Sequence, residues 1–209
     1  MKQKLIIIFS LSTIFLFLFF LFTILVKSDR LISFDFNTTV RIQNHTPKKL
    51  DEIFSYLSFF AKAEIIGIIL LILVLLRRKI KGITVLVIFV GAHVIEVIGK
   101  LFLLQPGPPF MFHRTHDDIF FDKDYVIPGS SYPSGHSMRT LFLSIIIAFL
   151  IYKTKKLSIQ IKVIMYSSIL LLTSLVLFSR VSLGEHWTTD VVGGTLLGIA
   201  MGILSLIFL

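Results

Sequence analysis

Polar and ionisable residues able to do chemistry gather in two short clusters of an otherwise apolar chain. One is the tetrapeptide Pro-Ser-Gly-His at residues 133–136, and the other contains Arg180, His186 and Asp190. Ionisable groups at the ends of membrane helices are costly and by default indicate a functional site. His186 and Asp190 are four residues apart where an apolar helix is expected to begin, so the carboxylate can hold one imidazole nitrogen. We therefore expect both clusters to form one site.

The composition of the remaining chain is that of a membrane protein. Of its 209 residues, 55% are hydrophobic and only 16% are charged, which lies outside the range of soluble domains. The absence of cysteine excludes disulfides, thiolate nucleophiles and thiolate metal ligands. The formal net charge is +9. Because the basic residues lie between apolar runs rather than on one polar face, we attribute this charge to membrane topology and expect no nucleic-acid partner.

The apolar runs predict an all-α fold, in which residues 1–209 form a single domain, a polytopic membrane bundle of six transmembrane helices. The expected spans are residues 5–26, 54–76, 83–104, 137–152, 161–178 and 188–209. The first run is long enough to cross a hydrocarbon core of about 30 Å. A cleavable signal peptide is the rival interpretation, but the run is too long and no small-residue cleavage site follows it.

Two segments between these runs have their own character. Residues 50–57 carry apolar side chains at helical spacing beside charged ones, which indicates an amphipathic helix at the membrane interface. Residues 105–136 contain several prolines and aspartates, and a loop of this length inside a compact protein is usually functional. We expect that loop to form part of the active site.

The distribution of lysine and arginine predicts the orientation. Basic residues concentrate near the N-terminus, at residues 77–81 and at residues 153–162, and such segments stay in the cytoplasm. We therefore expect a multi-pass protein of the cell membrane with cytoplasmic N- and C-termini and an extracytoplasmic active site. Gly194, Gly198 and Gly202 allow another helix to approach closely, either inside the bundle or across a homodimer interface.

Together, residues 133–136 and the pattern Ser179-Arg180, five residues, His186, three residues, Asp190 resemble the signatures of the type 2 phosphatidic acid phosphatase (PAP2) superfamily. The resemblance covers the chain from about the second span to its end. It implies a PAP2/haloperoxidase-like core and a phosphatase that needs neither metal nor cofactor. It further implies that His186 attacks phosphorus to form a phosphohistidine, that Asp190 steers its imidazole, and that His136 protonates the leaving oxygen. The phosphoryl oxygens would be held by Ser134, the Gly135 amide and Arg180.

A third signature of the family, a lysine followed after six residues by Arg-Pro, is incomplete here. Lys100 is followed by Gly107-Pro108. We expect Lys100 to bind phosphate, paired with Glu96 one helical turn earlier. The missing arginine removes a charged hydrogen bond worth about 1.5–3 kcal/mol. Three explanations remain open: Arg114 folds back to supply the donor, the substrate needs fewer contacts, or activity is weak or lost.

The expected substrate is a lipid phosphate or diphosphate, first undecaprenyl diphosphate and then phosphatidic acid or phosphatidylglycerophosphate, by analogy with small bacterial members of the family. Membrane lipids are the other expected partners. A lipid phosphotransferase of the same superfamily is one alternative, and a lipid-binding or transport protein with weakened catalysis is another. Arg139 is expected either to meet phosphate or Glu185 or to be a simple boundary charge. A further cluster is interpreted as solvated rather than metal-binding, namely His113, His116, Asp117 and Asp118.

Overall fold

The structure, a computed structural model, describes residues 2–77, 80–114 and 130–209. These residues form eight α-helices and no strand, which confirms the predicted all-α class. The α-helices are α1 (Lys2–Lys27), α2 (Ile32–His45), α3 (Asp51–Phe60), α4 (Ala63–Arg77), α5 (Ile83–Leu103), α6 (Gly135–Lys153), α7 (Ile159–Ser182) and α8 (Thr188–Ser205). Short 3-10 helices are η1 (Lys48–Leu50), η2 (Ile80–Gly82), η3 (Phe110–Phe112) and η4 (Leu206–Phe208).

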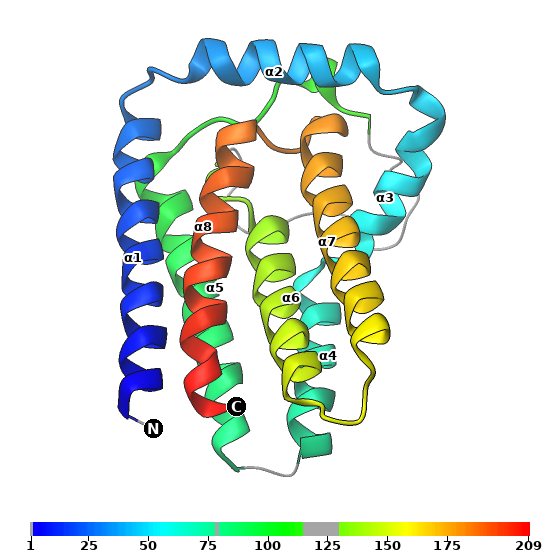
Figure 1. The fold of residues 1–209 in the computed structure, drawn as a ribbon. Coiled ribbons are helices and arrows are strands. Elements are labelled where there is room, and N and C mark those ends of the chain that lie inside the picture. Colours follow the sequence, from blue (N-terminus) through cyan, green and yellow to red (C-terminus); the bar gives the residue numbers. More distant parts are fainter. Residues whose placement is uncertain (1, 78–79, 115–129) are drawn as a thin grey trace.

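Five of the described helices are long and apolar enough to cross a membrane: α1, α5, α6, α7 and α8 continued by η4. They run along the length of the bundle in Figure 1. The predicted span over residues 54–76 is instead divided into α3 and α4, which meet at an angle of 49°. Taken as one broken span, this pair brings the number of crossings to the predicted six.

The first half of that broken span has a polar buried face, which accounts for its departure from a straight apolar helix. Asp51, Ser55 and Ser58 are buried beside Phe54, whereas Ile53 is exposed. Helix α3 packs through this face against α7. The amphipathic helix predicted over residues 50–57 therefore exists, but polar groups make up most of its inward face.

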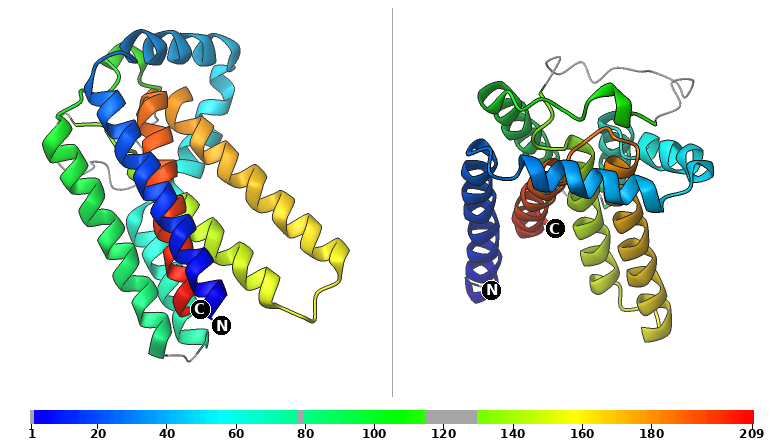
Figure 2. Two further views of the ribbon diagram at one scale, coloured as in Figure 1. Left: turned by 60° about the vertical axis from the view of Figure 1, so that its left-hand side comes forward. Right: turned by 90° about the horizontal axis from the view of Figure 1, so that it is seen from above.

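Helix α2 has no counterpart among the predicted elements. It lies across the end of the bundle opposite the two termini (Figures 1 and 2). Its buried positions, Asp35, Thr39 and Gln43, recur every four residues and are all polar, whereas Phe34 and Phe36 are exposed. Apolar periodicity cannot reveal such a helix, because the apolar side chains are on the outward face.

Helix α8 lies at the centre and packs against α1, α5 and α6. A Cβ atom at Gly194 would lie 2.2 Å from the Ser134 carbonyl oxygen, and one at Gly198 would lie 2.4 Å from that of Met138. The small-residue stripe thus brings α8 onto the backbone of α6 inside the bundle. This close packing places the first turns of the two helices, which carry the predicted clusters, side by side.

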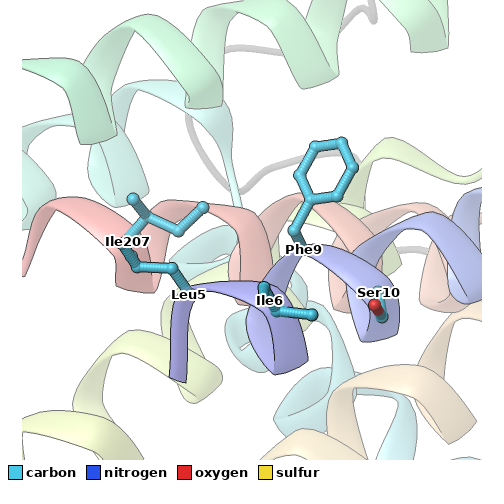
Figure 3. Close-up of a pocket in the computed structure, with 5 residues that line it drawn as sticks. All are labelled: Leu5, Ile6, Phe9, Ser10 and Ile207. Carbon is cyan, nitrogen blue, oxygen red and sulfur yellow. The ribbon is translucent and has the colours of Figure 1, made fainter. Parts of the chain in front are cut away.

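The outer surface of the bundle is apolar, as a lipid-facing surface must be. Many large apolar side chains of α1 are exposed, among them Ile6 and Phe9. A hollow of about 380 Å³ near the chain termini is lined by Leu5, Ile6, Phe9, Ser10 and Ile207 (Figure 3). Its lining contains none of the predicted site residues, so this hollow is separate from the chemistry.

Replacing Gly198 by alanine should destabilise the fold, because the added methyl group would press on the backbone of α6. Overpacking of this kind costs about 1–3 kcal/mol. The matched control is Gly67→Ala in α4, where a Cβ atom would approach only Phe89 Cε1, at 3.9 Å. Thermal unfolding in detergent should show a lower midpoint for Gly198→Ala and an unchanged or higher one for Gly67→Ala. Equal midpoints would contradict the proposed packing.

Candidate active site

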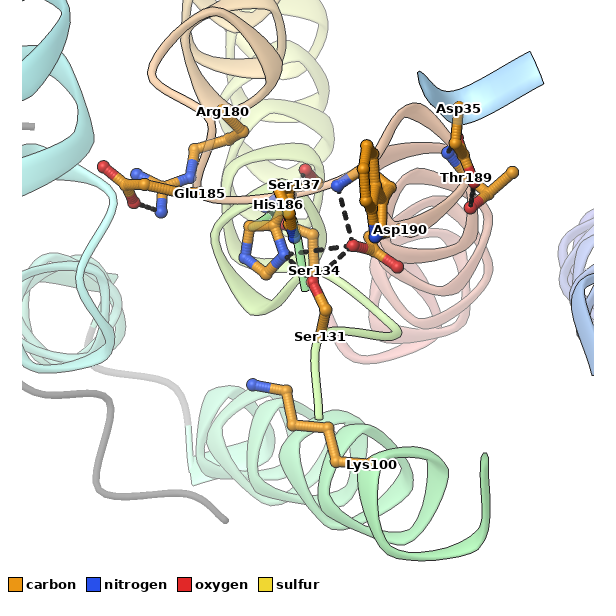
Figure 4. A network of polar contacts seen from close by, with 12 residues as sticks. Asp35, Lys100, Ser131, Ser134, Ser137, Arg180, Glu185, His186, Thr189 and Asp190 are labelled. Carbon is orange, nitrogen blue, oxygen red and sulfur yellow. Dashed lines mark hydrogen bonds and ion pairs between the residues drawn. The ribbon is translucent and has the colours of Figure 1, made fainter. Parts of the chain in front are cut away.

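The two predicted clusters meet at the end of the bundle that α2 covers (Figure 4). Ser134 is the N-cap of α6, where its Oγ accepts a hydrogen bond from the Ser137 amide at 3.4 Å, and His136 lies in the first turn. His186 lies in the connection between α7 and α8, and Asp190 in the first turn of α8. The Ser134 amide donates to the Asp190 carbonyl oxygen at 3.0 Å, which ties the two helix starts together.

His186 and Asp190 form the side-chain pair expected from their spacing. Nδ1 of His186 lies 3.5 Å from Oδ2 of Asp190. The same Oδ2 accepts hydrogen bonds from the Trp187 amide, at 2.8 Å, and from the Ser131 hydroxyl. Ser131 Oγ is also 3.0 Å from His186 Nδ1. Nδ1 is thus the oriented nitrogen of the ring, which directs Nε2 to the opposite side.

Burial also determines the protonation of His186. Desolvation lowers the pKa of His186 below its usual value, and the hydrogen bond with Asp190 only partly opposes this effect. A histidine with a lowered pKa is neutral at pH 7 and retains a lone pair on one nitrogen. That lone pair is what a nucleophile or a general base requires.

Lys100 belongs to a buried ionic cluster centred on Glu96. Lys100 Nζ lies 3.1 Å from Glu96 Oε1, which is the predicted pair, and Arg139 Nη1 lies 3.6 Å from Glu96 Oε2. Arg139 Nε donates to the Ala61 carbonyl oxygen at 3.1 Å, at the break between α3 and α4. The structure therefore pairs Arg139 with Glu96, a partner that was not among the alternatives expected for it. A Cβ atom at Gly135 would lie 2.1 Å from Glu96 Oε1, so any side chain at this position would displace the Glu96 carboxylate from its present place.

Arg180 is the most enclosed cation of the site. Its side chain is 1% exposed and forms an ion pair with Glu185. It also donates to the hydroxyl of Ser58 in α3, at 2.5 Å. Ser58 holds the guanidinium from a helix 122 residues away, and its own sequence surroundings contain no signal of this role. The sequence analysis also did not identify Ser131, although it lies only two residues before the predicted tetrapeptide.

The structure places Arg114 elsewhere than expected. Its guanidinium donates to the carbonyl oxygens of Thr46, at 3.2 Å, and Gln43, at 3.1 Å. Carbonyl groups at the end of a helix lack helical partners, and basic side chains commonly satisfy them. Arg114 therefore caps α2, and in this structure its guanidinium has these carbonyl partners in place of the phosphate-binding position proposed for it from the sequence. Position 107 itself adjoins the site, because a Cβ atom on Gly107 would lie 3.5 Å from Ser131 Oγ.

The predicted solvated cluster is only partly described. His113 Nε2 lies 3.1 Å from the Pro108 carbonyl oxygen, whereas His116, Asp117 and Asp118 lie outside the described residues. Within the ranges that the structure covers, no group of three or more His, Cys, Asp or Glu residues is arranged to hold a metal ion.

The arrangement suits a bound oxyanion. Lys100 and Arg180 supply buried positive charge, and the start of α6 presents backbone N–H groups and the positive end of its helix dipole. Such preorganised donors in a water-poor site stabilise phosphoryl oxygens well. Two buried histidines, His136 and His186, complete the set with one potential nucleophile and one potential proton donor.

Comparisons with known proteins identify the family to which the chain is similar. The PAP2 superfamily model matches residues 81–209. Phosphatidylglycerophosphatase B of Bacillus subtilis is 29% identical over 125 residues, which are 60% of this chain and 56% of that protein, so the match spans little more than half of that relative. Undecaprenyl-diphosphatase of Sulfolobus acidocaldarius is 29% identical over 196 residues, covering 92% of this chain and 88% of that protein.

Solved structures agree with this assignment at the level of the fold. The transmembrane PAP2 type phosphatidylglycerolphosphate phosphatase from Bacillus subtilis superimposes with a TM-score of 0.75 at 22% identity, and 95% of each chain is covered. LpxE of Aquifex aeolicus gives a TM-score of 0.59 at 23% identity over 83% of this chain and 94% of that one. With the family model matching more than half of its length, the chain belongs to the PAP2 superfamily.

Proposed function

We propose that this PAP2 protein is a membrane lipid phosphatase that hydrolyses a lipid phosphate or diphosphate through a phosphohistidine on His186. The observation that carries the proposal is the buried His186–Asp190 pair, in which the carboxylate orients Nδ1 so that Nε2 is the attacking atom. A neutral, oriented imidazole beside buried cations is the arrangement that nucleophilic attack on a phosphoryl group requires.

The reaction proceeds in two steps. In the first, the Nε2 lone pair of His186 forms a bond to phosphorus, the bond between phosphorus and the leaving oxygen breaks, and the imidazolium form of His136 donates a proton to that oxygen, so that the lipid alcohol or lipid monophosphate departs. In the second, water attacks phosphorus, the N–P bond breaks, and His136 takes back a proton from the water. Inorganic phosphate leaves and both histidines return to their starting states. This scheme uses no metal ion.

The binding groups have distinct roles in this scheme. Lys100 and Arg180 neutralise charge on the phosphoryl oxygens, and the Ser134 hydroxyl and the Gly135 amide donate hydrogen bonds at the start of α6. Glu96 and Glu185 hold the two cations while the site is empty. Because the Ser134 amide donates a hydrogen bond to the Asp190 carbonyl oxygen, the donors at the start of α6 are linked to the residue that orients the nucleophile.

For the substrate we propose undecaprenyl diphosphate first and phosphatidylglycerophosphate second. The relative from Sulfolobus acidocaldarius, which is named for the former, aligns over most of both chains. The relative and the solved structure from Bacillus subtilis support the latter. We further propose that the active site faces away from the cytoplasm. Both termini and the lysine-rich connection between α6 and α7 lie at the opposite end of the bundle (Figure 1).

The test is phosphate release from both lipids by the purified full-length protein in detergent with EDTA present. We expect wild-type turnover and loss of both turnover and covalent phosphate labelling in His186→Ala. His136→Ala should slow the reaction by about 10²–10⁴-fold, the usual contribution of general acid catalysis. His45→Ala, at an exposed histidine of α2, is the matched control and should behave as wild type.

Turnover by His186→Ala, or no release by wild type from either lipid, would refute the proposal. Transfer of phosphate to a second lipid instead of water would indicate a phosphotransferase.

Restoring the family arginine should strengthen substrate binding. Gly107→Arg starts its side chain beside Ser131 with only ordinary contacts, so the guanidinium can extend toward the phosphoryl group. A charged hydrogen bond of about 1.5 kcal/mol corresponds to about a tenfold lower KM. Gly107→Gln controls for bulk without charge. An unchanged or higher KM for Gly107→Arg than for Gly107→Gln would show that this position does not reach the substrate.

A further inference from the structure

Helix α8, which carries Asp190, begins with only half of a capping box, the half that Asp190 supplies. Trp187 occupies the N-cap position, and its side chain does not accept a hydrogen bond from the first turn. Serine, threonine, aspartate and asparagine are the residues that normally do so, because the first N–H groups of a helix lack partners. The nearby Asp190 carboxylate accepts from the Trp187 amide but leaves the Thr189 amide for another acceptor.

Asp35 of α2, 154 residues away, supplies that acceptor. Its Oδ1 accepts a hydrogen bond from the Thr189 amide at 2.9 Å, and its Oδ2 accepts one from the Thr189 hydroxyl at 2.6 Å. Figure 4 shows this contact directly beside Asp190. Asp35 is only 3% exposed, and Thr189 is buried as well. Both carboxylate oxygens of a buried residue are thus committed to the residue that precedes Asp190.

Helix α2 also contacts the other end of the connection between α7 and α8, which carries His186. Gln43, eight residues after Asp35 on the buried face of α2, donates through Nε2 to the carbonyl oxygens of Ser182, at 3.0 Å, and Phe112, at 2.7 Å. Ser182 ends α7 and Thr189 lies in the first turn of α8, so α2 bridges the two ends of the connection that carries His186.

The position of Asp35 has an energetic cost that ordinary packing does not explain. Desolvation raises the pKa of Asp35 to about 6, and the nearby Asp190 adds to this effect, while the hydrogen bonds from Thr189 oppose it. A buried carboxylate close to another carboxylate is retained only where its hydrogen bonds and the helix dipole compensate. Those compensating groups all belong to the start of α8.

We propose that Asp35 is a positioning residue of this enzyme: through Thr189 it holds the first turn of α8, and therefore the Asp190 carboxylate, against Nδ1 of His186. The inference rests on the proposed phosphohistidine reaction. Its expected signature is a fall in kcat that is larger than any rise in KM, because Lys100 on α5 and Arg180 on α7 are held by Glu96 and Glu185 and not by the start of α8.

The experiment measures kcat and KM of full-length variants in detergent with undecaprenyl diphosphate and phosphatidylglycerophosphate. Asp35→Ala should lower kcat about 100-fold, the usual effect of a small misplacement of catalytic groups. Asp35→Asn keeps one acceptor and should lose about tenfold. Thr189→Ser keeps both donors and should retain wild-type kcat. Thr39→Ala is the matched control, since Thr39 lies one turn along the same buried face and its hydroxyl has no hydrogen-bond partner among the described residues.

Hydrogen–deuterium exchange of the peptide covering residues 186–192 provides a readout that does not need turnover. Exchange should be faster in Asp35→Ala than in wild type and unchanged in Thr39→Ala. Wild-type kcat in Asp35→Ala and Asp35→Asn would overturn the positioning role and leave the proposed function intact. Equal losses in Thr39→Ala, or an increase in KM as large as the fall in kcat, would show general damage to α2 and also overturn it. If wild type is inactive on both lipids, the proposed function fails. Unchanged exchange in Asp35→Ala would then also exclude the proposed positioning of α8 by Asp35.

Discussion

The carboxylate of Asp190 is the interaction on which the rest of the site depends. It is fully buried, and its Oδ2 receives the Trp187 amide and the Ser131 hydroxyl while facing His186. Through its backbone carbonyl, the same residue accepts a hydrogen bond from Ser134 at the start of α6. One residue therefore aligns the imidazole, the loop before α6 and the N-terminus of α6. Because these contacts converge, the orientation of His186 and the position of the start of α6 are not independent.

Buried charge imposes the second constraint. An unpaired ion in a water-poor interior is far more costly than a paired one, so each cation near the site must have a partner while the site is empty. Glu96 serves Lys100 and Arg139, and Glu185 serves Arg180. In the reaction that we propose, the phosphoryl group would add negative charge to a set of cations that is already ordered. The cost of arranging these donors is thus met during folding rather than at the moment of reaction.

Helix α2 explains how a small bundle keeps this arrangement rigid at its exposed end. Its inward face is polar and its hydrogen bonds go to the start of α8, the end of α7 and the segment around Phe112. Arg114 completes the arrangement by capping α2 itself. Arg114, which the sequence suggested as a phosphate ligand, therefore has structural partners, and the family arginine missing at position 107 has no evident substitute among the described residues.

Local sequence information was sufficient for the membrane helices and for the two clusters, because apolar run length and residue spacing are local properties. The pair Glu96–Lys100 follows from the geometry of a single helical turn, and the pair His186–Asp190 from the same four-residue spacing across the start of a helix. Tertiary structure alone decided the rest. It decided the break between α3 and α4, the inward polar face of α2, and the contacts of Ser58 with Arg180 and of Asp35 with Thr189. The last two contacts join segments more than 100 residues apart. Such contacts have no periodicity to detect, because a buried polar side chain is determined by the partner that satisfies it and not by its neighbours in the chain.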